Sequence, residues 1–185
     1  MKSFFSILLV ACTLNLFAQT SNDDILKWNK YRHLTWNDFQ AQPDPNTYMG
    51  AHTSVHLEYS YEVTAYGCTV TTYSYFNKYL SWTKFTDDAV LLHHEQGHFD
   101  IDEYYHRLFV KRIMNSRLTY RNANTMLSKI YKDICTEMKA MNEKYDKETD
   151  HGRNKDNQLL WNTFIPDMVN SLEEYDLPTV EVRFR

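Results

Sequence analysis

The chain has 185 residues, a formal net charge of −4 and an aromatic content of 15 %, including 14 tyrosines. This length suits one domain of ordinary size. The charge is nearly balanced and no basic run occurs, so the electrostatic footprint of a nucleic-acid-binding protein is absent. The many amphipathic rings suit a packed core, or a groove for an extended peptide or a sugar.

Residues 1–18 are typical of a signal peptide. Lys2 gives a basic start, an apolar run covers residues 4–10, and cleavage is expected after Ala18. The run is too short and interrupted for a membrane span, so we expect a secreted or periplasmic mature chain, residues 19–185, without a transmembrane span. The alternative is a lipoprotein signal in which Cys12 is lipidated and anchors the protein to the cell envelope. For Cys68 and Cys135, a disulfide and two free thiols both stay open.

The first part of the mature chain is expected to be rich in strands. A short ordered element is expected over residues 34–39, after a polar lead-in. Apolar residues alternate from Ala51 to Val63 and again from Gly67 to Asn77, which predicts two strands joined as a hairpin. His52 and His56 fall opposite the apolar face of the first strand, so we expect them to face solvent rather than bind a metal.

The next segment carries the motif that organises the chain. Residues 88–114 have helical periodicity, with N-cap candidates at their start. Within them His94, Glu95 and His98 form an H-E-x-x-H pattern, which on a helix puts both imidazoles on one face, one turn apart. Two such imidazoles suit adjacent corners of a zinc tetrahedron, and Glu95 is placed to act as general base. For Gly97, between the two histidines, two explanations stay open: it allows another segment to approach closely, or it is incidental.

A zinc site of this kind needs a third protein ligand. Asp102 and Glu103 lie one further turn along the helix, about 6 Å beyond His98, which makes them poor candidates. A second helix is expected from about residue 124 to 147, and Glu137 on it is one alternative. His151 follows that helix and precedes a glycine, so its loop can be aimed freely; we favour His151 and leave Glu137 open.

The remaining chain adds a third helix and a final strand. The third helix is expected over residues 156–174, with Pro166 as a kink or an early end. Gln158 and Trp161 are members of its mostly apolar stripe. Residues 179–184 alternate and predict a last strand. Strands followed by helices indicate one α+β domain, residues 19–185.

Four stretches resemble a bacterial family described as predicted secreted zinc-dependent proteases, long catalogued as a domain of unknown function. They are residues 94–101, residues 145–152, residues 36–39 and residues 81–82. The resemblance implies a zincin-like fold and peptidase chemistry. It also supports His151 over Glu137, because the segment around His151 matches.

Motif and resemblance together predict a secreted zinc metallopeptidase acting on protein or peptide substrates. His94, His98 and His151 would hold Zn²⁺, and Glu95 would take the proton from the water that attacks a peptide carbonyl. Two other functions stay open: a zinc hydrolase acting on cell-wall amides, and a non-catalytic secreted or envelope domain whose metal is structural.

Several further groups are candidates for supporting roles. Tyr145 or Tyr120 could donate to the oxyanion. Asp146 and Asp150 are candidates to orient a ligand imidazole, or are plain helix-end carboxylates. The strand over residues 67–77 is a candidate edge for binding an extended peptide.

Overall fold

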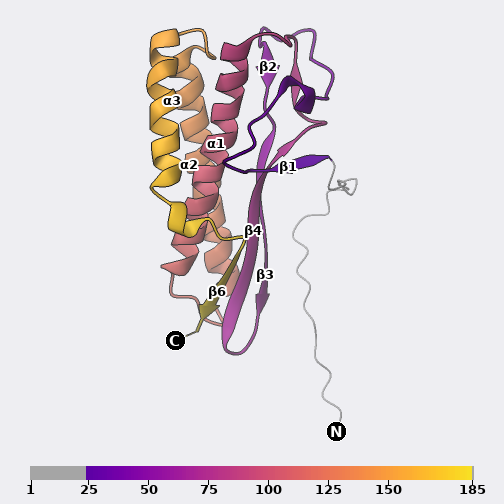
Figure 1. The fold of residues 1–185 in the computed structure, drawn as a ribbon. Coiled ribbons are helices and arrows are strands. Elements are labelled where there is room, and N and C mark those ends of the chain that lie inside the picture. Colours follow the sequence, from indigo (N-terminus) through magenta and orange to yellow (C-terminus); the bar gives the residue numbers. More distant parts are fainter. Residues whose placement is uncertain (1–23, 185) are drawn as a thin grey trace.

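The computed structural model describes residues 24–184 and has two layers, an antiparallel sheet and a group of three helices (Figure 1). The helices are α1 (Ala89–Met114), α2 (Ala123–Thr149) and α3 (Lys155–Asn170). The α+β architecture expected from the sequence is therefore confirmed. No helix within the described residues is long and apolar enough to cross a membrane. The predicted signal peptide and Cys12 lie outside these residues.

The long strand β4 (Gly67–Asn77) is the centre of the larger sheet. Strand β3 (Val55–Val63) pairs along one side of it, as the predicted hairpin, from Val63↔Cys68 to Val55↔Phe76. Two short strands share its other side, β1 (Ile25–Lys27) and β6 (Thr179–Arg183). The expectation that β4 offers a free edge to a peptide is therefore wrong, because its two sides are already paired.

The predicted strand from Ala51 to Val63 is interrupted. Its first two residues form β2 (Ala51–His52), which pairs with β5 (Trp82–Thr83) in a separate two-stranded sheet. Ser54 holds the break, because its N–H donates to Ser81 Oγ (2.9 Å) and its carbonyl accepts from Asn77 N–H (2.9 Å). The break carries residues 51–54 to the first turns of α1, where β2 and α1 touch (Figure 1).

The segment before β2 forms a second, smaller core, although the sequence suggested only a polar lead-in with one short element. Strand β1 opens it, and the 3-10 helix η1 (Trp36–Asp38) confirms the short element. Leu34 and Phe39 pack against Phe76 of β4 and Phe99 of α1. This core fixes the sheet against the middle of the motif helix.

Helix α1 lies at the centre of the molecule, touching both other helices and strands β2, β3, β4 and β6. The side chain of its N-cap residue, Asp88, accepts hydrogen bonds from the N–H groups of Val90 and Leu91, which have no partner within the helix. A helix surrounded in this way is buried on most of its circumference. Its main core residues are Ile101, Tyr105, Phe109, Val110 and Ile113.

The other two helices follow their predicted stripes. On α2, Leu127, Ile130 and Ile134 are buried against α1 and the sheet. Helix α3 continues for four residues past Pro166 and ends at Asn170, so the proline does not end it, and a 3-10 turn, η2 (Glu173–Tyr175), follows. Within the described residues, Cys68 and Cys135 are free thiols, Cys68 buried and Cys135 half-buried.

One buried group of α1 has no evident structural benefit. Neither oxygen of the Asp102 carboxyl has a hydrogen-bond partner among the described residues, and the side chain is fully buried. Burial, together with the nearby charge of Glu103, raises the pKa of Asp102 well above its usual value. The folded protein therefore keeps a proton that the unfolded chain releases above about pH 4. Below about pH 4 the Asp102 carboxyl is protonated in both states and its ionisation does not oppose folding. As the pH rises from there towards the folded-state pKa, folding must take up a proton, so the free energy of unfolding falls.

We predict that Asp102→Asn raises the free energy of unfolding at pH 7. The gain over wild type should grow by up to about 1.4 kcal/mol per pH unit above about pH 4, because the variant has no proton to hold. Denaturant unfolding between pH 4 and 8 measures it. Glu62→Gln, which alters an exposed carboxylate of β3, should stay within about 0.5 kcal/mol of wild type throughout. A pH-independent effect of Asp102→Asn would contradict the argument.

Candidate metal centre

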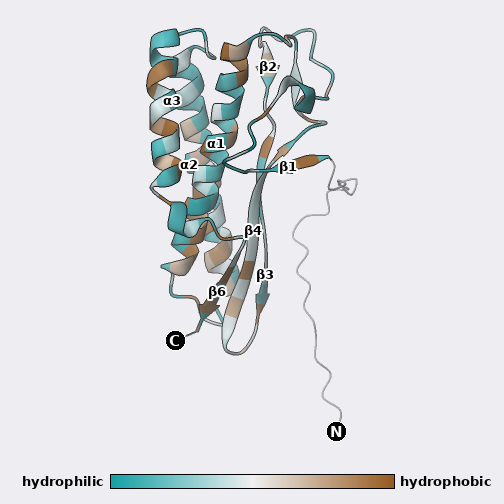
Figure 2. Cartoon of the chain, in the orientation of Figure 1, coloured by the Kyte–Doolittle hydropathy of each residue, from teal (hydrophilic) through white to brown (hydrophobic). Residues whose placement is uncertain are grey.

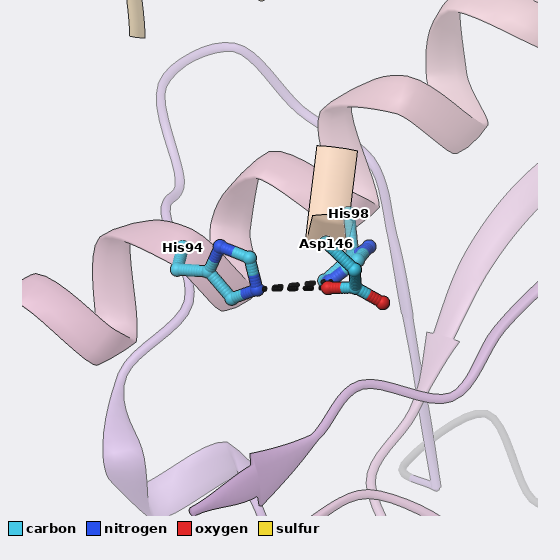
Figure 3. Close-up of side chains that lie close together, drawn as sticks. All are labelled: His94, His98 and Asp146. Carbon is cyan, nitrogen blue, oxygen red and sulfur yellow. Dashed lines mark hydrogen bonds and ion pairs between the residues drawn. The ribbon is translucent and has the colours of Figure 1, made fainter. Parts of the chain in front are cut away.

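Two helices, α1 and α2, bring three donor atoms together (Figure 3). His94 and His98 lie one turn apart on α1, and their Nε2 atoms are 3.3 Å from each other. Asp146 comes from α2, and its Oδ1 lies 3.1 Å from each of these nitrogens. Among the described residues, these three side chains form the group of His, Cys, Asp and Glu donors whose atoms all lie within 4.8 Å of one another.

These separations fit a tetrahedral cation. Zinc binds imidazole nitrogen and carboxylate oxygen at about 2.0–2.1 Å. The ligand-to-ligand edges of such a tetrahedron are therefore about 3.3 Å long. The three observed separations, 3.1, 3.1 and 3.3 Å, are close to that length. Three protein donors with one position left for water is the pattern of catalytic zinc sites.

Both imidazoles are oriented by amide side chains on their far side. Asn142 Oδ1 lies 2.7 Å from Nδ1 of His98, and Gln158 Oε1 lies 3.1 Å from Nδ1 of His94. Each amide oxygen accepts a hydrogen bond from the Nδ1–H, so each Nε2 carries a lone pair directed at Asp146. Two lone pairs and a carboxylate then face one point, an arrangement that favours a positive charge there.

The pKa values of the donors also indicate a position that favours positive charge. Burial favours a higher pKa for Asp146, but hydrogen bonds with His94 and His98 outweigh it and hold the pKa well below the usual range. Burial lowers the pKa of His98, yet the hydrogen bond to Asp146 and the charges of Glu95 and Asp146 outweigh that and raise it. The cluster thus attracts positive charge, whether a proton or a metal ion.

Glu95 lies beside the cluster on the same helix. It is buried, and Thr53 holds its carboxylate, with Oγ1 donating to Oε2 at 2.7 Å. Glu95 and the three donors line one cleft of about 890 Å³. The side chain of Asp146 is 28 % exposed, so water reaches the cluster from this cleft. A carboxylate beside a water-accessible metal position can act as general base.

Because Gly97 has no side chain, helix α2 can pack close to α1 at this position. A Cβ at this position would overlap the hydroxyl of Tyr145 and come within 2.8 Å of its Cζ. The Tyr145 ring stacks on His94 with 4.6 Å between ring centroids, and its hydroxyl donates to the His94 carbonyl oxygen at 3.2 Å. The expectation that Gly97 admits another segment is confirmed.

His151 lies next to the cluster rather than within it. Three consecutive residues after α2 have positive φ, namely Asp150 (48°), His151 (54°) and Gly152 (81°). This left-handed turn brings Nδ1 of His151 to 3.3 Å from Oδ1 of Asp146 and sets its ring against Tyr48. His151 therefore lines the cleft, and its role as a zinc ligand stays a prediction.

Other predicted candidates lie elsewhere. Glu137 forms a bidentate ion pair with Arg112, at 2.8 Å for each bond, and Arg112 is about 21 Å along α1 from His98. Glu103 pairs with Arg107 and Ser74 in the core. Neither belongs to the donor group.

The remaining supporting candidates are also placed. Tyr145 is buried with its hydroxyl engaged, and Tyr120 is 69 % exposed; neither lines the cleft. Asp150 pairs with Arg153. His52 lines the cleft, and half-buried His56 bonds to Ser54 Oγ, so only the first is near the site.

The predictions from the sequence missed three residues that contact the motif, and gave Asp146 only the role of orienting a ligand imidazole, or of a plain helix-end carboxylate. Asn142, Gln158 and Thr53 received no role, although each touches a motif residue. One signal was present: Gln158 is a buried polar residue on the apolar stripe of α3. Another was the spacing of Asn142 and Asp146, which lie four residues apart on one face of α2.

The fold and site define an α+β protein with a candidate metal centre on its motif helix. The family model of bacterial proteins of unknown function DUF922 matches residues 27–152, and the chain belongs to that family. The matched region runs from β1 to the turn after α2, and includes every donor, Glu95 and His151. No curated protein and no solved structure matches the chain.

We predict that Gly97→Ala lowers the free energy of unfolding by about 1–3 kcal/mol, because the new methyl group overpacks against Tyr145. At a helix position with free space, the same change would stabilise by up to about 1 kcal/mol. Adding Tyr145→Phe removes the hydroxyl oxygen that the new methyl group would meet first. The double variant should therefore lose less free energy of unfolding than the sum of the losses in the two single variants. Denaturant unfolding of the four proteins measures the coupling; a neutral Gly97→Ala would contradict the close contact.

Proposed function

We propose that the protein is a secreted zinc-dependent metallopeptidase with a zincin-like arrangement of its motif helix. The observation that carries the proposal is the convergence of His94 Nε2, His98 Nε2 and Asp146 Oδ1 beside Glu95 in one open cleft. The donor set is chemically that of a catalytic zinc site, two imidazoles and one carboxylate.

A zinc ion held there would lower the pKa of a water and polarise the carbonyl to be attacked. Glu95 accepts the proton from the attacking water and passes it to the leaving nitrogen. Thr53 keeps the carboxylate of Glu95 in one orientation through its 2.7 Å hydrogen bond. Asn142 and Gln158 keep the imidazoles in the tautomer that binds a metal.

Asp146 is our choice for the third ligand. Its oxygen is equidistant from both Nε2 atoms, whereas the contact of His151 with the cluster is to Asp146 itself. His151 then serves as a cleft residue whose Nδ1 supports the Asp146 carboxylate. The competing assignment, with His151 as ligand, follows from the sequence resemblance and makes the opposite prediction for metal binding.

We expect purified protein to bind about one zinc ion per chain. Asp146→Ala should weaken zinc binding by more than about 100-fold, since even partners outside the ligand shell are worth about 10–100-fold. Glu95→Gln should bind zinc within about tenfold of wild type, and His151→Ala, which removes only a partner of the Asp146 carboxylate, should weaken zinc binding by no more than about 10–100-fold. Competition with a chromophoric chelator measures this. Glu143→Ala is the matched control, an exposed carboxylate of α2 three residues before Asp146.

The opposite pattern, in which His151→Ala loses zinc and Asp146→Ala keeps it, would make His151 the third ligand. A wild-type protein that binds no zinc would remove the basis of the proposed enzyme.

We expect Glu95→Gln to lower kcat on a fluorescent protein substrate by about 10²–10⁴-fold, the usual contribution of a general base. Zinc content should be unchanged, and Glu143→Gln should behave as wild type. The same proteins are assayed on peptidoglycan fragments, because cleavage there alone would favour the cell-wall amidase alternative. A zinc-loaded protein inactive on both, and destabilised by zinc removal, would instead be the non-catalytic domain with a structural metal.

A further inference from the structure

One wall of the cleft is apolar and open to solvent. Tyr48, Phe85 and Val90 are 79, 49 and 44 % exposed, and they line the same cleft as the three donors. Single exposed apolar side chains are ordinary, but several gathered in one concave surface mark a place that a ligand covers. Figure 2 shows the start of α1, beside β2, as hydrophobic.

The apolar wall stands close to the candidate reaction centre. Val90 precedes His94 by one helical turn, and Leu91, which also lines the cleft, precedes Glu95 by one turn. One turn corresponds to about 6 Å along the axis. An extended peptide advances about 3.3 Å per residue. A side chain within two residues of the attacked carbonyl can therefore reach this wall.

Backbone contacts hold the wall in place. A Cβ at Gly50 would lie 3.0 Å from Leu91 Cδ2 and 3.1 Å from Phe85 Cε2, so the chain at residue 50 packs directly on both side chains. The carbonyl of Gly50 accepts from Lys84 N–H at 2.8 Å, and the pairing of β2 with β5 follows immediately. The part of the wall at Phe85 is thus packed against the backbone before any ligand arrives, which limits the entropy lost on binding.

The lining that α2 and the segment after it contribute to the cleft is more polar and basic. It presents Lys139, Asn142, Arg153 and Lys155, together with one apolar side chain, Met138. A large apolar side chain of a bound peptide therefore finds its most extensive complementary surface on the wall of Tyr48, Phe85 and Val90.

Building on the peptidase function proposed above, we propose that the wall of Tyr48, Phe85 and Val90 is a specificity subsite. Its ligand is a large apolar side chain, such as Phe, Leu or Met, within two residues of the cleaved bond of an extended peptide.

The binding test uses zinc-loaded Glu95→Gln protein, so that no peptide is consumed. Two capped octapeptides with an Ala/Gly background carry either Phe or Ser at the centre, and titration calorimetry gives their affinities. The Phe peptide should bind at least about tenfold more tightly, as expected for burying an aromatic side chain. Adding Phe85→Ser or Val90→Ser should reduce this ratio at least about threefold.

Phe164→Ser is the matched control, because Phe164 on α3 is 48 % exposed and outside the cleft. It should leave the ratio unchanged. Thermal unfolding and zinc content verify that each variant is folded. Equal binding of the two peptides, or no binding of either, would overturn the subsite.

Cleavage by zinc-loaded wild type separates the two proposals. Sequencing the products of a mixed peptide library should show apolar residues enriched at one position within two residues of the cut. Cleavage without such enrichment would overturn the subsite and leave the peptidase intact. Selective binding of the Phe peptide without any cleavage would refute the peptidase and support an apolar peptide-binding cleft.

Discussion

The contact of Gly97 with Tyr145 fixes how α1 and α2 meet, and the candidate metal centre depends on it. The Tyr145 hydroxyl donates to the His94 carbonyl and accepts from Gln158 at 2.8 Å, which ties three helices together. Asp146 follows Tyr145 directly, so the register that seats the ring over Gly97 also directs the carboxylate at both Nε2 atoms. The donor geometry is therefore a result of helix packing, which is more rigid than a loop.

The turn that follows α2, next to His94, has a strained backbone that lowers stability. Positive φ at non-glycine residues costs of order 1–3 kcal/mol each, and Asp150 and His151 are two such residues in succession. The turn holds because Gly152 packs on His94, where an added Cβ would lie 3.1 Å from the His94 Cβ. Strain retained at the mouth of a cleft is typical of a site maintained for function rather than for stability.

The sequence predicted the parts of the fold that follow from local periodicity. The three helices, the hairpin of β3 and β4 and the last strand are confirmed, because each has a pattern of its own period. The approach of Asp146 to both motif histidines depends on the register between α1 and α2, which no local pattern encodes, so the sequence predicted Asp146 only as a group that orients a ligand imidazole or as a plain helix-end carboxylate. Likewise, the break at Thr53 and Ser54 lies inside a continuous alternation and is set by contacts with Ser81 and Asn77.

That break links Glu95 to the cleft wall. Thr53 donates to the Glu95 carboxylate, while three residues earlier Gly50 packs on Phe85 and Leu91. An unbroken strand through residues 51–63 would keep residues 51–54 in the larger sheet, since successive residues of a strand follow one line. Glu95 would lose its hydrogen bond from Thr53, and the start of α1 would lose its contact with β2 at the same time. In this fold, the position of Glu95 and the shape of the apolar wall are therefore set by one short segment.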